Sequence, residues 1–189
     1  MRLISLWTLP FLCASCVSLY TGAARTADPA ILNEPGWVAV PDVPDIRQTQ
    51  EQDCGAAALA MVLAKLRKPL SLEEIRRACP PDPDPEIAVD KLRDLARSLG
   101  LESWRIEGTL NLLLTELEDF RPVVVGLVKP YAGRGVTHYE VVVAIHRDRR
   151  EVVTLDPARG LTVTTWPGFI AEWDPAMRVM LIVWPPAPK

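Results

Sequence analysis

The stretch QTQEQDCGAAALAMVLAKL, residues 48–66, constrains the fold of this chain more than any other segment. Its larger apolar residues have helical spacing and predict an amphipathic helix with one stripe facing a core. The residues of this stripe are Leu59, Val62, Leu63 and Leu66. Cys54 is therefore expected at or just before the helix N-terminus, where unpaired N–H groups favour a thiolate. Two interpretations of Cys54 are open at this point: a nucleophile, or a small buried residue that begins a core helix.

Length and composition indicate one well-packed domain and exclude several partner classes. The chain has 189 residues, of which 49% are hydrophobic, enough for a single core. Its formal charge of −3 comes from interspersed acidic and basic residues, so no basic stripe indicates nucleic-acid binding. The chain has only two histidines, and no His, Cys and Asp spacing indicates a metal site, so we expect no cofactor.

The first 24 residues have the pattern of an export signal: one Arg, an apolar run too short to span a bilayer comfortably, then small residues. In the favoured interpretation, residues 13–16 (CASC) form a lipoprotein cleavage site and Cys16 carries the lipid. Alternatively, a signal peptidase cuts near residues 22–24, or the segment stays as an uncleaved membrane anchor. We expect a protein of the bacterial cell envelope, with a flexible linker at residues 25–36 and a domain at residues 37–185.

Helical segments come first along the domain, and β-branched segments dominate its second half. We expect helices at residues 54–66, 71–78, 86–99 and 109–120. We expect strands at residues 37–40, 101–106, 122–128, 138–145, 151–155, 161–165 and 178–184. This order predicts an α+β domain in which helices pack against a mostly antiparallel sheet.

A thiol nucleophile needs a base, a group that orients the base, and donors for an oxyanion. His138 opens one predicted strand and Asp156 closes the next, so a hairpin would make them neighbours at one sheet edge. His146 precedes the charged turn RDRR and is expected to be solvent-exposed. Taken singly, His138 reads as a half-buried strand residue and Asp156 as a turn residue. Together with Cys54, in this order, they indicate a catalytic triad.

Two further cysteine questions bear on this hypothesis. With the first two cysteines assigned to the export signal, the domain keeps Cys54 and Cys79, which could form a disulfide in an exported protein. Such a bridge would exclude a nucleophilic Cys54. We expect both thiols to be free, with Cys79 a bystander at a helix end.

The segment QTQEQDCGAAALAMVL resembles the Q-x5-CG-x-A-x-L-x-M signature of the bacteriocin-processing, double-glycine cysteine peptidases, a papain-like group. The resemblance spans roughly residues 37–184. It implies a papain-like fold and assigns an oxyanion-hole amide to Gln48, which the residues alone do not distinguish from Gln50 or Gln52. HYEVV resembles the family's HYVV strand and implies that His138 is the base. Asp156-Pro157 matches its D-P motif.

The resemblance implies hydrolysis of a peptide bond after small, Gly-Gly-like residues in a peptide or protein precursor, beside an export system. Many family members form part of an ATP-driven exporter, whereas this domain follows an export signal with no transporter attached. Two alternatives keep the fold: a peptide-binding pseudo-peptidase, and an acyltransferase or transglutaminase-like enzyme that uses the same triad. Trp104, Trp166 and Trp173 either form walls of the substrate cleft or fill the core.

Overall fold

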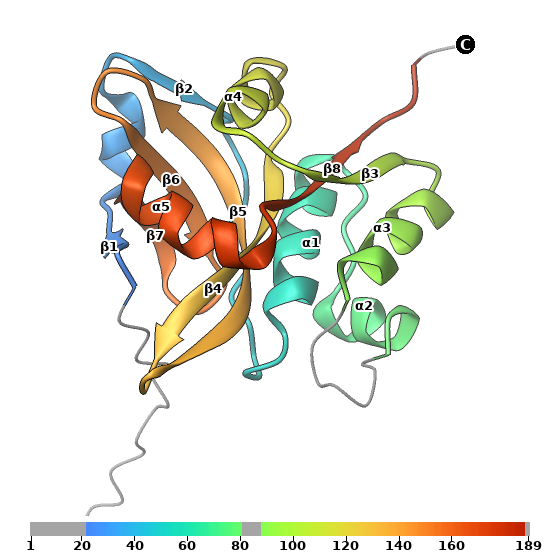
Figure 1. Ribbon diagram of the computed structural model, residues 1–189. Helices are drawn as coiled ribbons and strands as arrows, with labels where there is room; N and C mark the ends of the chain where they lie inside the picture. Colours follow the sequence, from blue (N-terminus) through green and yellow to red (C-terminus); the bar gives the residue numbers. More distant parts are fainter. Residues whose placement is uncertain (1–21, 81–87, 188–189) are drawn as a thin grey trace, which may run out of the picture.

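An eight-stranded sheet with helices on both faces forms the body of the computed structural model, which describes residues 22–80 and 88–187 (Figure 1). The strand order is β1-β7-β6-β5-β4-β8-β3, and β2 pairs with β5. Every one of these pairings is antiparallel, which confirms the predicted α+β class. The strands are β1 (Arg25–Thr26), β2 (Trp37–Ala39), β3 (Glu102–Glu107), β4 (Val123–Tyr131), β5 (Arg134–His146), β6 (Glu151–Asp156), β7 (Gly160–Thr165) and β8 (Val179–Trp184).

The helices of the described residues cover both faces of this sheet (Figure 1). They are α1 (Cys54–Lys65), α2 (Leu72–Ala78), α3 (Val89–Ser98), α4 (Leu110–Glu118) and α5 (Trp166–Trp173), with the 3-10 turns η1 (Pro29–Asn33) and η2 (Asp174–Ala176). Ser71 and Glu74 form the predicted capping box of α2. None of these helices combines the length and the apolar character that a bilayer crossing requires.

Two hydrophobic cores lie on opposite faces of the sheet. One joins α1, α2 and α3 to strand residues such as Val124 and Val141. The other joins α4 and α5 to the alternate residues of the same strands, such as Val125 and Val142. Burial on both faces explains why the central strands read as continuous β-branched runs instead of alternating apolar and polar residues.

Helix α1 differs from the predicted amphipathic helix with a single buried stripe. Every residue from Cys54 to Leu63 is buried, so its first ten residues are enclosed on all sides. The reason is its small-residue composition: the alanines at positions 56–58 and 60 let neighbouring elements approach closely around the whole helix. A helix that is apolar all round is a core helix, and α1 is the central helix of this domain.

Three other predictions need correction. Residues 25–36, expected as a flexible linker, form β1, η1 and the approach to β2, and β1 pairs with β7. Residues 129–137, which separate the predicted strands at 122–128 and 138–145, are mostly strand, because β4 and β5 continue to a tight turn in which Ala132 and Gly133 have positive φ. His146 is buried, because β2 pairs alongside it and the Trp37 ring packs edge-on at a centroid distance of 5.2 Å.

Candidate active site

Cys54 is the first residue of α1 and is 5% exposed. Asp53 occupies the N-cap position but makes no side-chain cap hydrogen bond to the helix. The N–H groups of the first turn therefore keep their partial positive charge at the thiol. Cys54 and Cys79 are both free, so the disulfide alternative is excluded. Cys79 is buried against α3, where its Sγ lies 3.4 Å from the carbonyl oxygen of Lys91.

His138 and Asp156 form the predicted pair on neighbouring strands. His138 Nε2 lies 2.8 Å from Asp156 Oδ1, and each side chain is only 1% exposed. His138 sits inside β5 and not at its start, because the hairpin extends beyond the predicted loop. Asp156 is the last residue of β6, and its Oδ1 also accepts a hydrogen bond of 2.8 Å from the Ala158 N–H. The turn thereby fixes the carboxylate, and the carboxylate fixes the ring.

The electrostatics of the pair favour a charged imidazole. Burial alone would lower the pKa of His138, but hydrogen bonds to Asp156 and Cys54, with the charges of both partners, raise it to about 10. Burial alone would raise the pKa of Asp156, yet its hydrogen bond with His138 and the imidazolium charge lower it overall. Cys54 is thus close enough to His138 to contribute to this pKa shift, and Nδ1 is the ring nitrogen that Asp156 does not contact.

Gln48 lies in the loop that precedes α1, and the backbone of this loop is tied to the turn after β6. The Gln48 N–H donates to the Pro157 carbonyl oxygen at 3.0 Å, and Arg47 donates to the Ala158 carbonyl oxygen at 2.5 Å. The Gln48 side-chain amide donates within its own loop, to the carbonyl oxygens of Gln50 (3.1 Å) and Glu51 (3.4 Å). The loop backbone is therefore bonded to the turn that follows Asp156, while the side-chain N–H groups of Gln48 bond carbonyl oxygens of their own loop.

Asp53 is a site residue that the sequence argument missed. It is 1% exposed, and its Oδ2 accepts hydrogen bonds from the Thr49 hydroxyl (2.7 Å), the Gln50 N–H (3.0 Å) and the Thr49 N–H (3.3 Å). Its Oδ1 lies 3.4 Å from Arg76 at the end of α2. Asp53 therefore holds the shape of the Gln48 loop directly before the nucleophile. In the sequence, the only indication of this role is that Asp53 directly precedes Cys54.

The predicted tryptophans have different environments. Trp173 is 1% exposed and donates to the Val179 carbonyl oxygen at 3.1 Å, so it fills the core. Trp104 is 52% exposed on β3. Trp166 is half-buried at the start of α5, where it lines a cavity together with α4 residues.

Comparison with known proteins identifies the family. Residues 42–187 match the model of the Peptidase C39 family, which is most of the chain. The chain belongs to this family. As a C39 member it is a cysteine-type peptidase, a hydrolase, as the sequence resemblance predicted. A mesentericin transport/processing ATP-binding protein (MesD) of Leuconostoc mesenteroides is 32% identical over 129 residues. The match covers 68% of this chain and only 17% of that relative.

Solved structures share the fold of this C39 domain. A double-glycine-motif protease from an AMS/PCAT transporter, solved with its leader peptide, has 26% identity and a TM-score of 0.63, covering 78% of this chain and 95% of that one. The peptidase domain of Streptococcus ComA has 22% identity and a TM-score of 0.61, covering 75% and 97%. A C39-like peptidase from Bacillus anthracis has 15% identity and a TM-score of 0.64, covering 80% and 99%. The papain-like cysteine-peptidase fold is confirmed.

Proposed function

We propose that this C39 domain hydrolyses a peptide bond through Cys54, His138 and Asp156. The observation that carries the proposal is the buried His138–Asp156 hydrogen bond of 2.8 Å beside a cysteine at a helix N-terminus. In the first step the Cys54 thiolate attacks the substrate carbonyl carbon. Imidazolium at His138 then protonates the leaving amine, and the acyl-enzyme is hydrolysed by a water molecule that His138 deprotonates.

The oxyanion would be stabilised by the Cys54 backbone N–H and by the Gln48 side-chain amide. For Gln48 this requires one amide hydrogen to leave its loop carbonyl when the substrate binds. Loss of one such donor lowers turnover on the order of a hundredfold or more, so Gln48→Ala should keep a small residual activity.

Small residues before the scissile bond, Gly-Gly in the simplest case, are the proposed specificity. Support comes from the AMS/PCAT relative, which is described as a double-glycine-motif protease and has a leader peptide bound. The MesD relative combines transport and processing, so a partner export system is part of the proposal. The match covers only 17% of that relative.

We also propose an envelope location with a lipid on Cys16, which lies outside the described residues. The interaction of residues 23–27 with the domain supports cleavage before Cys16 over cleavage near residues 22–24. Ala24 is buried, the Ala23 N–H donates to Glu172 at 2.9 Å, and β1 pairs with β7. A cut within residues 22–24 would remove residues that the domain binds. Mass spectrometry of the mature protein tests this, and a free amine beyond Cys16 would exclude the lipid.

Cys54→Ala tests the hydrolase directly, and Cys79→Ala is its matched control because Cys79 is the other buried, free thiol. With a fluorogenic Gly-Gly peptide, we expect no turnover from Cys54→Ala and unchanged turnover from Cys79→Ala. Iodoacetamide at mildly acidic pH should label Cys54 rapidly and spare Cys79, because burial raises the pKa of the Cys79 thiol. Full activity of Cys54→Ala would refute the proposal, and amide products formed with added amines would favour acyl transfer over hydrolysis.

A further inference from the structure

Three charged side chains from three different elements are buried together. Lys129 of β4 places Nζ 2.7 Å from Glu140 Oε1 of β5 and 2.6 Å from Glu172 Oε2 of α5. The three residues are 2%, 1% and 5% exposed. Burying charges is costly, and apolar residues of similar volume often serve as well or better for stability. Stability alone therefore does not account for this group.

The group adjoins the proposed catalytic pair. Glu140 is two residues beyond His138 on β5, so the pleat places both side chains on the same face of the sheet. The ligand-type atoms of His138, Glu140 and Asp156 all lie within 4.8 Å of one another. A second carboxylate at this distance from Asp156 would raise the pKa of one of the two by like-charge repulsion. A charged Glu140 without a cation beside it would therefore repel the Asp156 carboxylate and favour its protonation.

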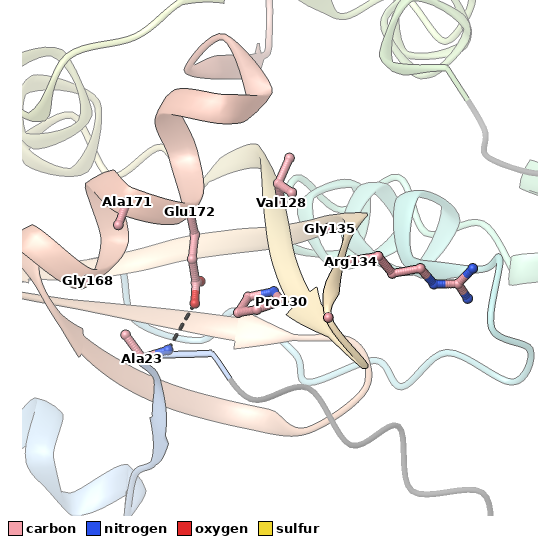
Figure 2. Close-up of a pocket in the computed structure, with 9 residues that line it drawn as sticks. Ala23, Val128, Pro130, Arg134, Gly135, Gly168, Ala171 and Glu172 are labelled. Carbon is pink, nitrogen blue, oxygen red and sulfur yellow. Dashed lines mark hydrogen bonds between the residues drawn. The ribbon is translucent and has the colours of Figure 1, made fainter.

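The remaining contacts of the group involve neutral donors. The Thr154 hydroxyl of β6 donates to Glu140 Oε2 at 2.6 Å, and Thr162 of β7 lies 2.9 Å from that hydroxyl. Glu172 Oε1 accepts the Ala23 N–H at 2.9 Å, beside a cavity of about 560 Å³ under the β4–β5 hairpin (Figure 2). Lys129 is thus a cation that contacts both glutamates.

We propose that Lys129 is a positioning residue of the active site, which neutralises Glu140 so that Asp156 remains the ionised partner of His138. This inference rests on the triad of the proposed function. The charge of Lys129 also contributes to lowering the pKa of Asp156, after the larger contributions of burial, which opposes ionisation, and of His138 and the Ala158 N–H, which favour it. Lys129 contacts Glu140 and Glu172, and its effect on His138 passes through Glu140 and Asp156.

The test is a pH profile of kcat and KM for Lys129→Met, with Lys129→Met/Glu140→Gln as the rescue. We expect the acid limb of kcat to move to higher pH in Lys129→Met, so that the variant loses a larger fraction of the wild-type kcat at pH 5.5 than at pH 8, with little change in KM. Glu140→Gln in the same chain should return the limb close to its wild-type position.

Arg121→Met is the matched control, because Arg121 also pairs with two carboxylates, Glu116 at 2.6 Å and Asp119, but at the C-terminal end of α4. Its pH profile should equal that of the wild type. A Lys129→Met enzyme that loses the same fraction of kcat at every pH, or a double variant no better than the single one, would overturn the inference. If Lys129→Met does not fold, Glu140→Gln alone decides: a raised acid limb in this variant contradicts the proposal.

Failure of the inference is distinguishable from failure of the proposed function. Cys54-dependent hydrolysis by the wild type tests the function and involves no change at Lys129. The rate of iodoacetamide labelling of Cys54 between pH 5.5 and 8 provides the same profile without a substrate. The wild type could cleave no peptide while the pH profile of Cys54 labelling still differed between wild type and Lys129→Met. That result would refute the proposed substrate and keep the positioning role of Lys129.

Discussion

Replacing Asp156 with Asn tests the central electrostatic claim about the site, which is that the carboxylate keeps His138 protonated. Asn has nearly the same shape, and its amide oxygen can still accept the 2.8 Å hydrogen bond from the Ala158 N–H. The change therefore removes the negative charge opposite His138 Nε2 with little disturbance of the turn. In the opposite orientation the amide would present its NH₂ group to the ring and hold the imidazole in the wrong tautomer, at the expense of the Ala158 hydrogen bond, because one oxygen makes both contacts.

The expected magnitude follows from the contact itself. A buried hydrogen bond to a charged group is worth about 1.5–3 kcal/mol, and about 1.4 kcal/mol corresponds to one pKa unit. The pKa of His138, about 10 in the wild type, should therefore fall by about one to two units. Because the folded-state pKa is raised, the associated stability is fully present below the unfolded value of about 6.5 and is lost as pH rises through about 10. Asp156→Asn should lose this stabilisation at a lower pH than the wild type.

NMR titration of the histidine ring protons measures this shift without any substrate. The chain has two histidines, so His146, at the opposite end of the β5–β6 hairpin, is an internal control in the same spectra. The His138 midpoint should move down in Asp156→Asn, while the His146 signal should behave alike in both proteins. An unchanged His138 midpoint in a folded Asp156→Asn protein would refute the assignment of Asp156 as the group that holds the charge on the ring.

Two further predictions concern the scaffold around the site. Asp53→Ala leaves buried loop donors without their acceptor, so we expect a loss of about 1–3 kcal/mol in urea unfolding and a fall in kcat through the displaced Gln48 loop; unchanged kcat would contradict a positioning role. Trp173→Ala should cost about 3–5 kcal/mol because the ring fills the core, whereas Trp104→Ala should cost about 1 kcal/mol or less because that ring is half exposed and contacts the Arg97 guanidinium. Equal losses for the two tryptophans would contradict this assignment of core and surface.

The sequence predicted the elements whose determinants are local. The predicted hairpin between residues 138–145 and 151–155 is present as β5 and β6, and it places His138 against Asp156 as expected. The helix predicted at residues 54–66 is α1, which ends one residue earlier. In both cases local signals were sufficient, namely the β-branched runs with a polar turn between them and the run of helix-forming residues after Cys54, although the single buried stripe predicted for α1 was wrong.

The features that the sequence did not predict depend on distant partners. Helix α5 begins Trp-Pro-Gly, which reads as a break, although the Thr165 cap and a proline in the first turn are a known helix start. A histidine directly before a charged turn is usually exposed to solvent, and His146 is buried because β2 pairs with this end of β5. Lys129 and Glu140 are isolated charged residues within apolar strands, a pattern that indicates a buried ion pair. The sequence does not show that Glu172 of α5 is the third member of the group, because that contact depends on the tertiary fold.

The geometry of the site is held mainly by contacts that take no part in the chemistry. The Gln48 N–H bonds the Pro157 carbonyl oxygen, and Asp53 fixes the loop between Gln48 and the nucleophile. These bonds join the start of α1 to the turn that carries Asp156, whatever residue stands at position 54. Cys54→Ala should therefore keep the fold and its peptide site while losing turnover. That separation of scaffold from chemistry explains how a peptide-binding protein without catalysis could arise on the same fold, and why the proposed hydrolysis depends on the side chains at positions 54, 138 and 156.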